Sequence, residues 1–371
     1  MNESGKRNLA ADVFRGLGLW ILFIDHLQPN FWAHFTPAQF GFSDFAEIFV
    51  FFSGYINALM YERALQSGGF AAGIRKLRTR LVRLYFAHVA TMAASIAILA
   101  LFAVYGVRLG EPVLYLWESA PWEYAWRTLV LLYAPHWYSL LPLYIALAPF
   151  TVLAVYTLRR WPGASLTASF AVWCLAQLSI TDFGVMTRQE AWYFRPLAWQ
   201  WMAVMGAATA MYWMRVREAA QSRPARFSAW AVVAGVFAVK AAALAPSVRD
   251  RILEHSSLLA HDAGKARLAP FRLLHFLSLA VLAISVPWNE STLLESRFVR
   301  LAASLGRDSL FIYCLTLILS LVMNLFLAVH PGGPLLQLAC TLVGLGAMTG
   351  IAVLRYSRKS LEKDQRRSGI H

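Results

Sequence analysis

The stretch that decides the fold lies near the N-terminus and reads DVFRGLGLWILFIDH over residues 12–26. It has the pattern of an apolar helix, with Arg15 towards one end and His26 at the other. Two helical residues eleven positions apart lie on nearly the same face, about 16 Å from one another along the axis. Charged groups inside a membrane span are costly and usually functional. This stripe therefore favours an enzyme whose two substrates approach from opposite sides of a bilayer.

The composition of the whole chain is that of a polytopic membrane protein. Of its 371 residues, 58% are hydrophobic and only 15% are charged, against about 25% charged residues in soluble domains. The net charge of +14 comes from short basic clusters between apolar runs. Such clusters orient helices in a membrane, so we expect no nucleic-acid partner. We predict one membrane domain over residues 1–371, with a short cytoplasmic segment at 1–12 and a basic cytoplasmic tail at 355–371.

The apolar runs predict an all-α integral membrane protein, a bundle of about ten transmembrane helices. No small-residue cleavage site follows the first run, which indicates a retained helix rather than a signal peptide. Most lysines and arginines fall in one set of alternate connecting segments. The positive-inside rule then places both termini in the cytoplasm and the His26 end outside. The predicted spans are 13–31, 45–60, 84–107, 137–158, 164–180, 197–214, 227–245, 271–288, 309–329 and 335–354.

Two other classes of function have less support in the sequence. The three cysteines, Cys174, Cys314 and Cys340, lie in apolar runs without paired spacing, which indicates inert thiols. The histidines have no ligand spacing, so we expect no metal site. A transporter would also place polar groups inside the membrane, and it stays open as an alternative. No inverted repeat or matching pair of broken helices is visible to favour it.

Several motifs resemble a known superfamily of membrane enzymes. Arg15, ten residues and then His26 resemble the first-helix motif of the membrane acyltransferase 3 superfamily, and FVFFSGY at 49–55 resembles its second-helix run. The likeness is closer still to the OpgC family, the osmoregulated periplasmic glucan succinyltransferases. The stretches that carry it are FIDH at 23–26, FGFSDFAEIFVF at 40–51, LPLYI at 141–145, PLAWQ at 196–200, RLLHFL at 272–277 and GRDSL at 306–310. Arg195 departs from the small amide residue expected before Pro196, which bears on the substrate.

The resemblance implies an O-acyltransferase of the bacterial inner membrane. It would move an acyl group, with succinyl as the leading candidate, from a cytoplasmic acyl-CoA to hydroxyls of a periplasmic glucan. O-acetyl transfer to another cell-envelope polysaccharide is the alternative. No tightly bound cofactor is implied, and the expected partners are acyl-CoA, an oligosaccharide or glucan, and membrane lipids.

His26 is the candidate catalytic base, and Asp25 and Arg15 complete the catalytic set. A sugar hydroxyl is a weak nucleophile at neutral pH, and histidine has the free pKa best matched to accepting its proton. Adjacent helical residues point about 100° apart, so we expect Asp25 to contact a neighbouring helix unless local geometry turns it to the imidazole. Arg15 either pairs with Asp12 at the inner surface or faces the bundle interior and binds the donor. Gly16 would let a neighbouring helix approach closely there.

The candidate donor site lies on the second and third spans. The run RLVRLY at 80–85 resembles an Arg-x-x-Arg element that the superfamily uses for donor binding. Arg80 and Arg83 are three residues apart, share a helix face and can grip phosphate oxygens, although an ordinary positive-inside cluster fits the same residues. Ser53 of the second-helix motif is assigned to this site. His88 is assigned there too, although an interior histidine with satisfied nitrogens fits the pattern better.

The candidate acceptor site lies at the outer ends of the second and fourth spans. Asp44 and Glu47 begin the second span, where the helix dipole favours carboxylates. Glu47 is the better functional candidate, because it enters an apolar run in which an unpaired charge would be expensive. Trp137 and Tyr138 either border an acceptor groove or belong to the aromatic belt. Nothing places the two carboxylates across a cleft as glycoside hydrolysis requires.

Overall fold

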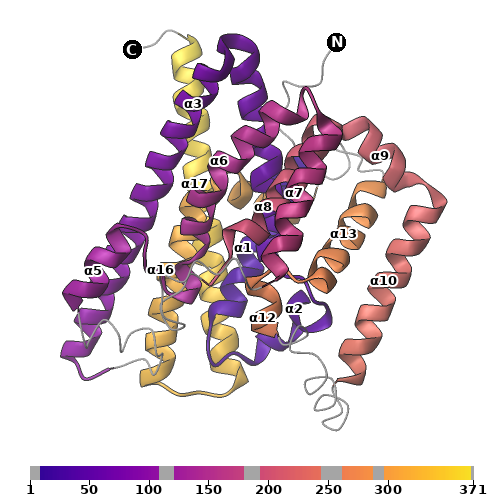
Figure 1. Cartoon of the computed structure of the whole chain (residues 1–371). Coiled ribbons are helices and arrows are strands. Elements are labelled where there is room, and N and C mark those ends of the chain that lie inside the picture. Colours follow the sequence, from indigo (N-terminus) through magenta and orange to yellow (C-terminus); the bar gives the residue numbers. More distant parts are fainter. Residues whose placement is uncertain (1–8, 108–120, 179–192, 244–260, 287–295, 369–371) are drawn as a thin grey trace. The chain divides into compact units, whose positions relative to one another are not determined.

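The computed structural model describes residues 9–107, 121–178, 193–243, 261–286 and 296–368, and every regular element in these ranges is a helix (Figure 1). Five helices are long and apolar enough to cross a membrane, namely Phe45–Val104, His136–Leu158, Arg223–Ala242, Ser309–Val329 and Pro334–Arg358. The all-helical membrane class is therefore confirmed. The number of ten spans and the cytoplasmic termini stay predictions. Residues 1–8 of the expected N-terminal segment and 369–371 of the expected tail lie outside the described ranges.

Helix α3 (Phe45–Val104) joins two of the predicted spans in one element of 60 residues. Its helical backbone is interrupted at Gly68 and Gly69, where Gly69 adopts φ +61°. Glycine populates this left-handed region without steric penalty. The chain turns back at this point, so that residues far apart in α3 meet (Figure 1). A hydrogen bond of 3.1 Å from Arg80 to the hydroxyl of Ser53 joins the two arms.

The chain divides into two compact units whose segments alternate along the sequence. The first comprises Met1–Thr36, Ala90–Leu109 and Trp288–His371, and the second comprises Pro37–Val89 and Gly110–Pro287. Because α3 runs from Phe45 to Val104, its residues contribute to both units. The expectation of a single domain stays a prediction.

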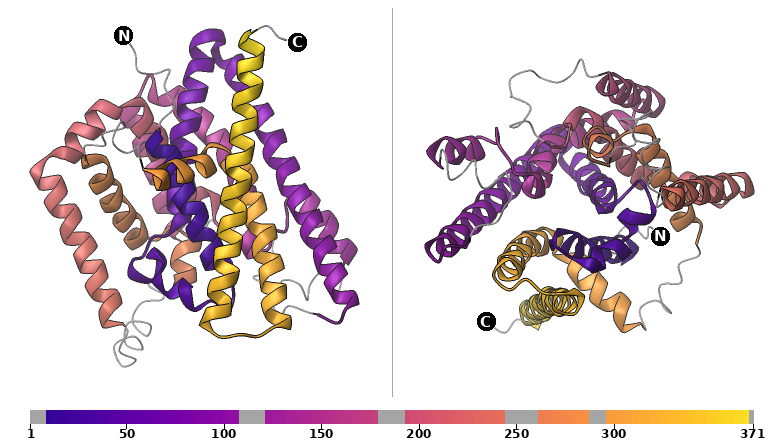
Figure 2. Two further views of the ribbon diagram at one scale, coloured as in Figure 1. Left: turned by 180° about the vertical axis from the view of Figure 1, so that it is seen from behind. Right: turned by 90° about the horizontal axis from the view of Figure 1, so that it is seen from below.

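In the first unit, α1 packs against α15, and α16 and α17 run side by side (Figure 2). A Cβ atom at Gly16 would overlap the backbone carbonyl of Ala302, and one at Gly306 would overlap that of Asp12. Small residues allow such backbone contact between membrane helices, so the expected close approach at Gly16 is confirmed. The elements of this unit are α1 (Leu9–His26), η2 (Phe31–Phe35), α15 (Arg297–Arg307), α16 (Ser309–Val329) and α17 (Pro334–Ser368).

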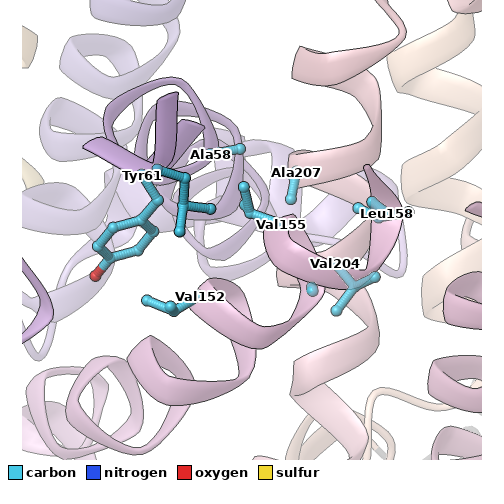
Figure 3. Close-up of a cluster of buried hydrophobic side chains, with 9 residues drawn as sticks. Ala58, Tyr61, Val152, Val155, Leu158, Val204 and Ala207 are labelled. Carbon is cyan, nitrogen blue, oxygen red and sulfur yellow. The ribbon is translucent and has the colours of Figure 1, made fainter. Parts of the chain in front are cut away.

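In the second unit, α3, α6 and α8 enclose an apolar core. Tyr61, Val152, Val155 and Leu158 are buried there together with residues of α8 (Figure 3). Prolines in the first turn open α7, α8, α10 and α13, where a missing N–H leaves no bond unmade. Besides α3, the elements are α2 (Pro37–Phe40), α5 (Pro121–Leu129), η3 (His136–Tyr138), α6 (Leu140–Leu158), α7 (Pro162–Gln177), α8 (Pro196–Met211), α9 (Trp213–Gln221), α10 (Arg223–Ala242), α12 (His261–Ala266) and α13 (Pro270–Ser285).

Candidate active site

His26 is the last residue of α1, and its surroundings hold the end of that helix in place. The side-chain amide of Asn324, on α16, donates to the carbonyl oxygen of His26 at 2.9 Å. The side-chain oxygen of Asn324 accepts a hydrogen bond from the backbone N–H of Gln28 at 2.8 Å. The last carbonyls of a helix lack partners within the helix. The side-chain amide of Asn30 donates to one of them, the carbonyl oxygen of Ile24, at 2.9 Å. Two asparagines thereby fix the position from which the buried imidazole projects.

Asn324 is a residue whose role the sequence did not reveal. It was visible only as an amide inside the apolar run 309–329, and such polar groups in a span are expected to bond to a neighbouring helix. What the run does not indicate is which backbone groups the amide contacts. Asp25 is half-buried, and its expected contact with a neighbouring helix stays a prediction.

Arg15 pairs with Asp12, as one interpretation of the sequence proposed, and it also contacts a neighbouring helix; donor binding by Arg15 stays a prediction. Its guanidinium lies 3.7 Å from the Asp12 carboxylate, one turn back in α1. It also donates to the hydroxyl of Ser309, at the start of α16. Only 20% of the Arg15 side chain is exposed, and Asp12 is shared with Arg307 of α15 at 4.0 Å. Arg15 therefore faces the helices of its own unit rather than extending away from them.

Arg80 and Ser53, two of the donor-site candidates, are in contact. The Arg80 guanidinium donates to the Ser53 hydroxyl at 3.1 Å, and Asn57 donates to the same oxygen at 3.2 Å. Within the part of the chain that the structure describes, no carboxylate lies in ion-pair range of Arg80. The buried hydroxyl of Tyr61 has no hydrogen bond to any described residue. Arg80 is thus a cation that donates to a hydroxyl and retains an Nε–H without a hydrogen-bond partner among the described residues.

Arg83 and His88 differ from what the sequence indicated. Arg83 is exposed while Arg80 is half-buried, so the two arginines do not turn the same side to the rest of the unit. His88 is 1% exposed, and neither ring nitrogen has a hydrogen-bond partner among the described residues. The interpretation of His88 as an interior histidine with satisfied nitrogens is therefore wrong. A buried polar atom without a partner is destabilising, which makes this imidazole a candidate for contact with a ligand.

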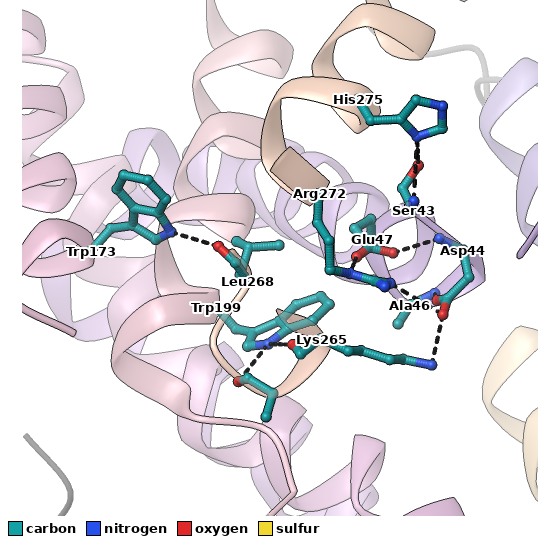
Figure 4. Close-up of polar contacts among 11 residues, drawn as sticks. Ser43, Asp44, Ala46, Glu47, Trp173, Trp199, Lys265, Leu268, Arg272 and His275 are labelled. Carbon is teal, nitrogen blue, oxygen red and sulfur yellow. Dashed lines mark hydrogen bonds and ion pairs between the residues drawn. The ribbon is translucent and has the colours of Figure 1, made fainter. Parts of the chain in front are cut away.

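Asp44 and Glu47 close the start of α3 with a reciprocal pair of hydrogen bonds (Figure 4). The Asp44 carboxylate accepts the N–H of Ala46 at 2.8 Å, and the Glu47 carboxylate accepts the N–H of Asp44 at 2.9 Å. This is the capping-box arrangement, in which side chains satisfy the first N–H groups of a helix. Both carboxylates therefore stabilise the N-terminus of α3, the structural role that their position at the start of the helix predicts.

The same carboxylates are also neutralised by two cations that the sequence did not assign to them. Arg272 on α13 lies 2.7 Å from Glu47 and 3.2 Å from Asp44, and Lys265 on α12 lies 2.7 Å from Asp44 (Figure 4). Burial alone would raise the pKa of Asp44, but the positive charges of Lys265 and Arg272 outweigh it and hold that pKa below its ordinary value. Glu47 is fully buried and both its oxygens are engaged. The charge of Glu47, which would be expensive if unpaired in an apolar run, is paired with Arg272.

The segment that carries Lys265 is fixed by its backbone. The indole N–H of Trp199 donates to the carbonyls of Lys265 and Ala266 at 3.1 and 3.2 Å. The N–H of Arg195 donates to Ala266 at 3.0 Å. Arg195, which differs from the residue expected from the family resemblance, is thus bonded to the residue after Lys265, beside the Asp44 and Glu47 cluster. Trp137 and Tyr138 are half-buried in η3, and their part in an acceptor groove stays a prediction.

Long apolar helices with buried ion pairs between them are typical of an integral membrane protein. The family model described as OpgC protein matches residues 7–360. The chain belongs to the OpgC family, which implies acyltransferase activity in general. No curated protein and no solved structure matches the chain.

Proposed function

We propose that the protein is an O-acyltransferase of the bacterial inner membrane, which moves a succinyl group from cytoplasmic succinyl-CoA to hydroxyls of a periplasmic glucan. Membership of the OpgC family supports acyl transfer. The observation that carries the donor assignment is the Arg80 guanidinium, bound to the Ser53 hydroxyl instead of a carboxylate. A guanidinium with free donors suits the phosphates of coenzyme A.

His26 acts as the general base in this proposal. It accepts the proton of a glucan hydroxyl while the hydroxyl oxygen attacks the thioester carbonyl. The carbon–sulfur bond then breaks, and the imidazolium returns the proton to the sulfur, so that coenzyme A leaves as the thiol. Asn324 positions the end of α1 through the backbone on both sides of His26. Arg15 contacts the donor towards the other end of the same helix, and Asp25 supports the imidazolium.

The acceptor side is built on Asp44, Glu47, Trp137 and Tyr138. Because the oxygens of both carboxylates already bind backbone N–H groups and cations, their contribution is to hold Arg272 and Lys265 in position rather than to bind sugar directly. Trp137 and Tyr138 offer ring faces and polar edges to a glucan. Membrane lipids are the remaining partners.

The proposal is tested with purified protein in lipid nanodiscs, radiolabelled succinyl-CoA and a periplasmic glucan. We expect label to move to the glucan, and His26→Ala to lower the rate by about 10²- to 10⁴-fold without loss of folded protein. Transfer from acetyl-CoA alone would select the acetyltransferase alternative. Equal rates for wild type and a well-folded His26→Ala variant would place the base elsewhere.

The donor assignment has a matched control three residues away. Arg80→Lys keeps the charge but loses the forked geometry of the guanidinium, so the apparent Kd for succinyl-CoA should rise by roughly tenfold or more. Arg83→Lys should change it little, because that side chain is exposed. Unchanged donor affinity in Arg80→Lys would reduce Arg80 to an inner-surface anchor, and the donor site would be sought near Arg15 and Arg307.

A further inference from the structure

Lys240 is a positive charge inside a candidate membrane span. It lies in the last turn of α10, a helix long and apolar enough to cross a membrane. Its ammonium group lies 5.5 Å from the ring centroid of Phe42, within cation–π range, and the side chain is half-buried. The stacked pair Phe40 and Phe237 holds the same segment against α10. The charge is therefore directed towards the segment before α3.

The described carboxylates near this position are already paired with cations other than Lys240. Asp44 and Glu47 are both neutralised by Lys265 and Arg272, at 2.7 to 3.2 Å. Within the described ranges, Lys240 forms no ion pair with a carboxylate. Ionisable groups inside a membrane usually pair with one another or bind a substrate. Among the described residues, Lys240 is thus a cation in a candidate span without a carboxylate partner, which indicates that an anion binds here.

His275 supplies a hydrogen-bond donor beside this charge. Its Nδ1 lies 2.6 Å from the Ser43 hydroxyl and 3.3 Å from the Ser43 backbone nitrogen (Figure 4). Because a backbone N–H can only donate, Nδ1 is the acceptor, and the proton of the neutral ring resides on Nε2. Gly41 packs directly on the ring, since a Cβ there would overlap it. Lys240 lies against the ring of Phe42, and His275 contacts the next residue, Ser43, so both side chains meet the same short segment before α3.

We propose that Lys240 and the Nε2–H of His275 bind the free carboxylate of a dicarboxylic acyl group, and so select a succinyl-type donor over acetyl. This inference rests on the proposed function and assigns a specificity site within it. A carboxylate has two oxygens, which suit one ammonium and one N–H donor. An acetyl group has no carboxylate and leaves Lys240 without its anion.

The test compares two donors in one enzyme. Lys240→Met keeps the length and apolar stem of the side chain but removes the charge. We expect kcat/KM for succinyl-CoA to fall about ten- to a hundredfold, while kcat/KM for acetyl-CoA falls far less. Ser43→Ala removes the hydroxyl contact to Nδ1 but keeps the backbone N–H, so it should shift the donor ratio in the same direction by a smaller amount. The matched control is Arg226→Met, at the other end of α10 and exposed, which should leave the donor ratio unchanged.

Three results would overturn the inference. An equal fall for both donors in Lys240→Met would assign the lysine a structural role. Unchanged kcat/KM for both donors would make it a lysine that extends to the lipid headgroups. Equal binding of succinyl-CoA to wild type and Lys240→Met, measured by equilibrium dialysis, would exclude the carboxylate site even if catalysis were absent. A wild-type protein that transfers neither group would instead overturn the proposed function, and the dialysis result would still decide the site.

Discussion

Replacing Arg272 by methionine should destabilise the second unit strongly, and a second substitution should restore much of the loss. Arg272 is the only described residue in ion-pair range of Glu47, at 2.7 Å, and Glu47 is 0% exposed. Asp44 keeps Lys265 at 2.7 Å, so the stranded charge is that of Glu47 alone. Removing one partner of a buried ion pair typically costs about 3–5 kcal/mol.

The double variant Arg272→Met with Glu47→Gln separates the ion pair from the packing. It removes both charges, and the glutamine still accepts the N–H of Asp44 through its carbonyl oxygen. Since buried ion pairs can be replaced by neutral groups at little net cost, we expect the double variant within about 1–2 kcal/mol of wild type. The coupling energy is then about 2–3 kcal/mol plus the cost of Glu47→Gln alone.

The measurement is the free energy of unfolding in lipid bicelles by steric trapping, for wild type, both single variants and the double variant. Glu47→Gln alone should cost less than Arg272→Met, because Arg272 retains Asp44 at 3.2 Å. Additive effects of the two substitutions would refute the reasoning. They would mean that Arg272 stabilises the unit by packing alone.

Three further predictions concern topology, positioning and packing. A cysteine at Pro37 should react with an impermeant thiol reagent in intact cells, and one at Gly69 should not; the reverse pattern would invert the donor and acceptor sides. Asn324→Ala should lower kcat about tenfold or more by releasing the end of α1, with donor Kd unchanged; an unchanged kcat in folded protein would remove its positioning role. Gly306→Val should lower the unfolding free energy by about 1–3 kcal/mol, since its side chain would overlap the Asp12 carbonyl; a neutral effect in the same bicelle assay would show that α1 and α15 can separate there.

The helices were readily predicted because their signal is local. Each of the ten expected spans overlaps a helix within the described residues, since long apolar runs leave the backbone no partner except itself. The partners of the buried charges were harder to predict. The pattern indicated that Glu47 enters an apolar run, but its partner Arg272 lies 225 residues away, and nothing local relates the two.

The candidate site was predicted in part for the same reason. The motif placed Arg80 and Ser53 in one site, and the structure brings them into contact. Three-residue spacing suggested that Arg83 would join them, but a helix buries only a narrow stripe, and Arg83 lies beyond its edge. For His88, the sequence identified a buried histidine but not whether its nitrogens have partners, which depends on every surrounding helix.

The interruption of α3 at Gly68 and Gly69 determines which face the second arm of this helix turns towards the first arm. Ser53 and Arg80 meet across this turn, 27 residues apart. Adding or removing one residue in the turn would rotate the second arm by about 100° relative to the first. Arg80 would then leave Ser53, and a neighbouring side chain would take its place. The length of a two-glycine turn thus determines which residue of the second arm contacts the hydroxyl of Ser53. This short connection therefore shapes the candidate donor site, although it contributes no side chain to it.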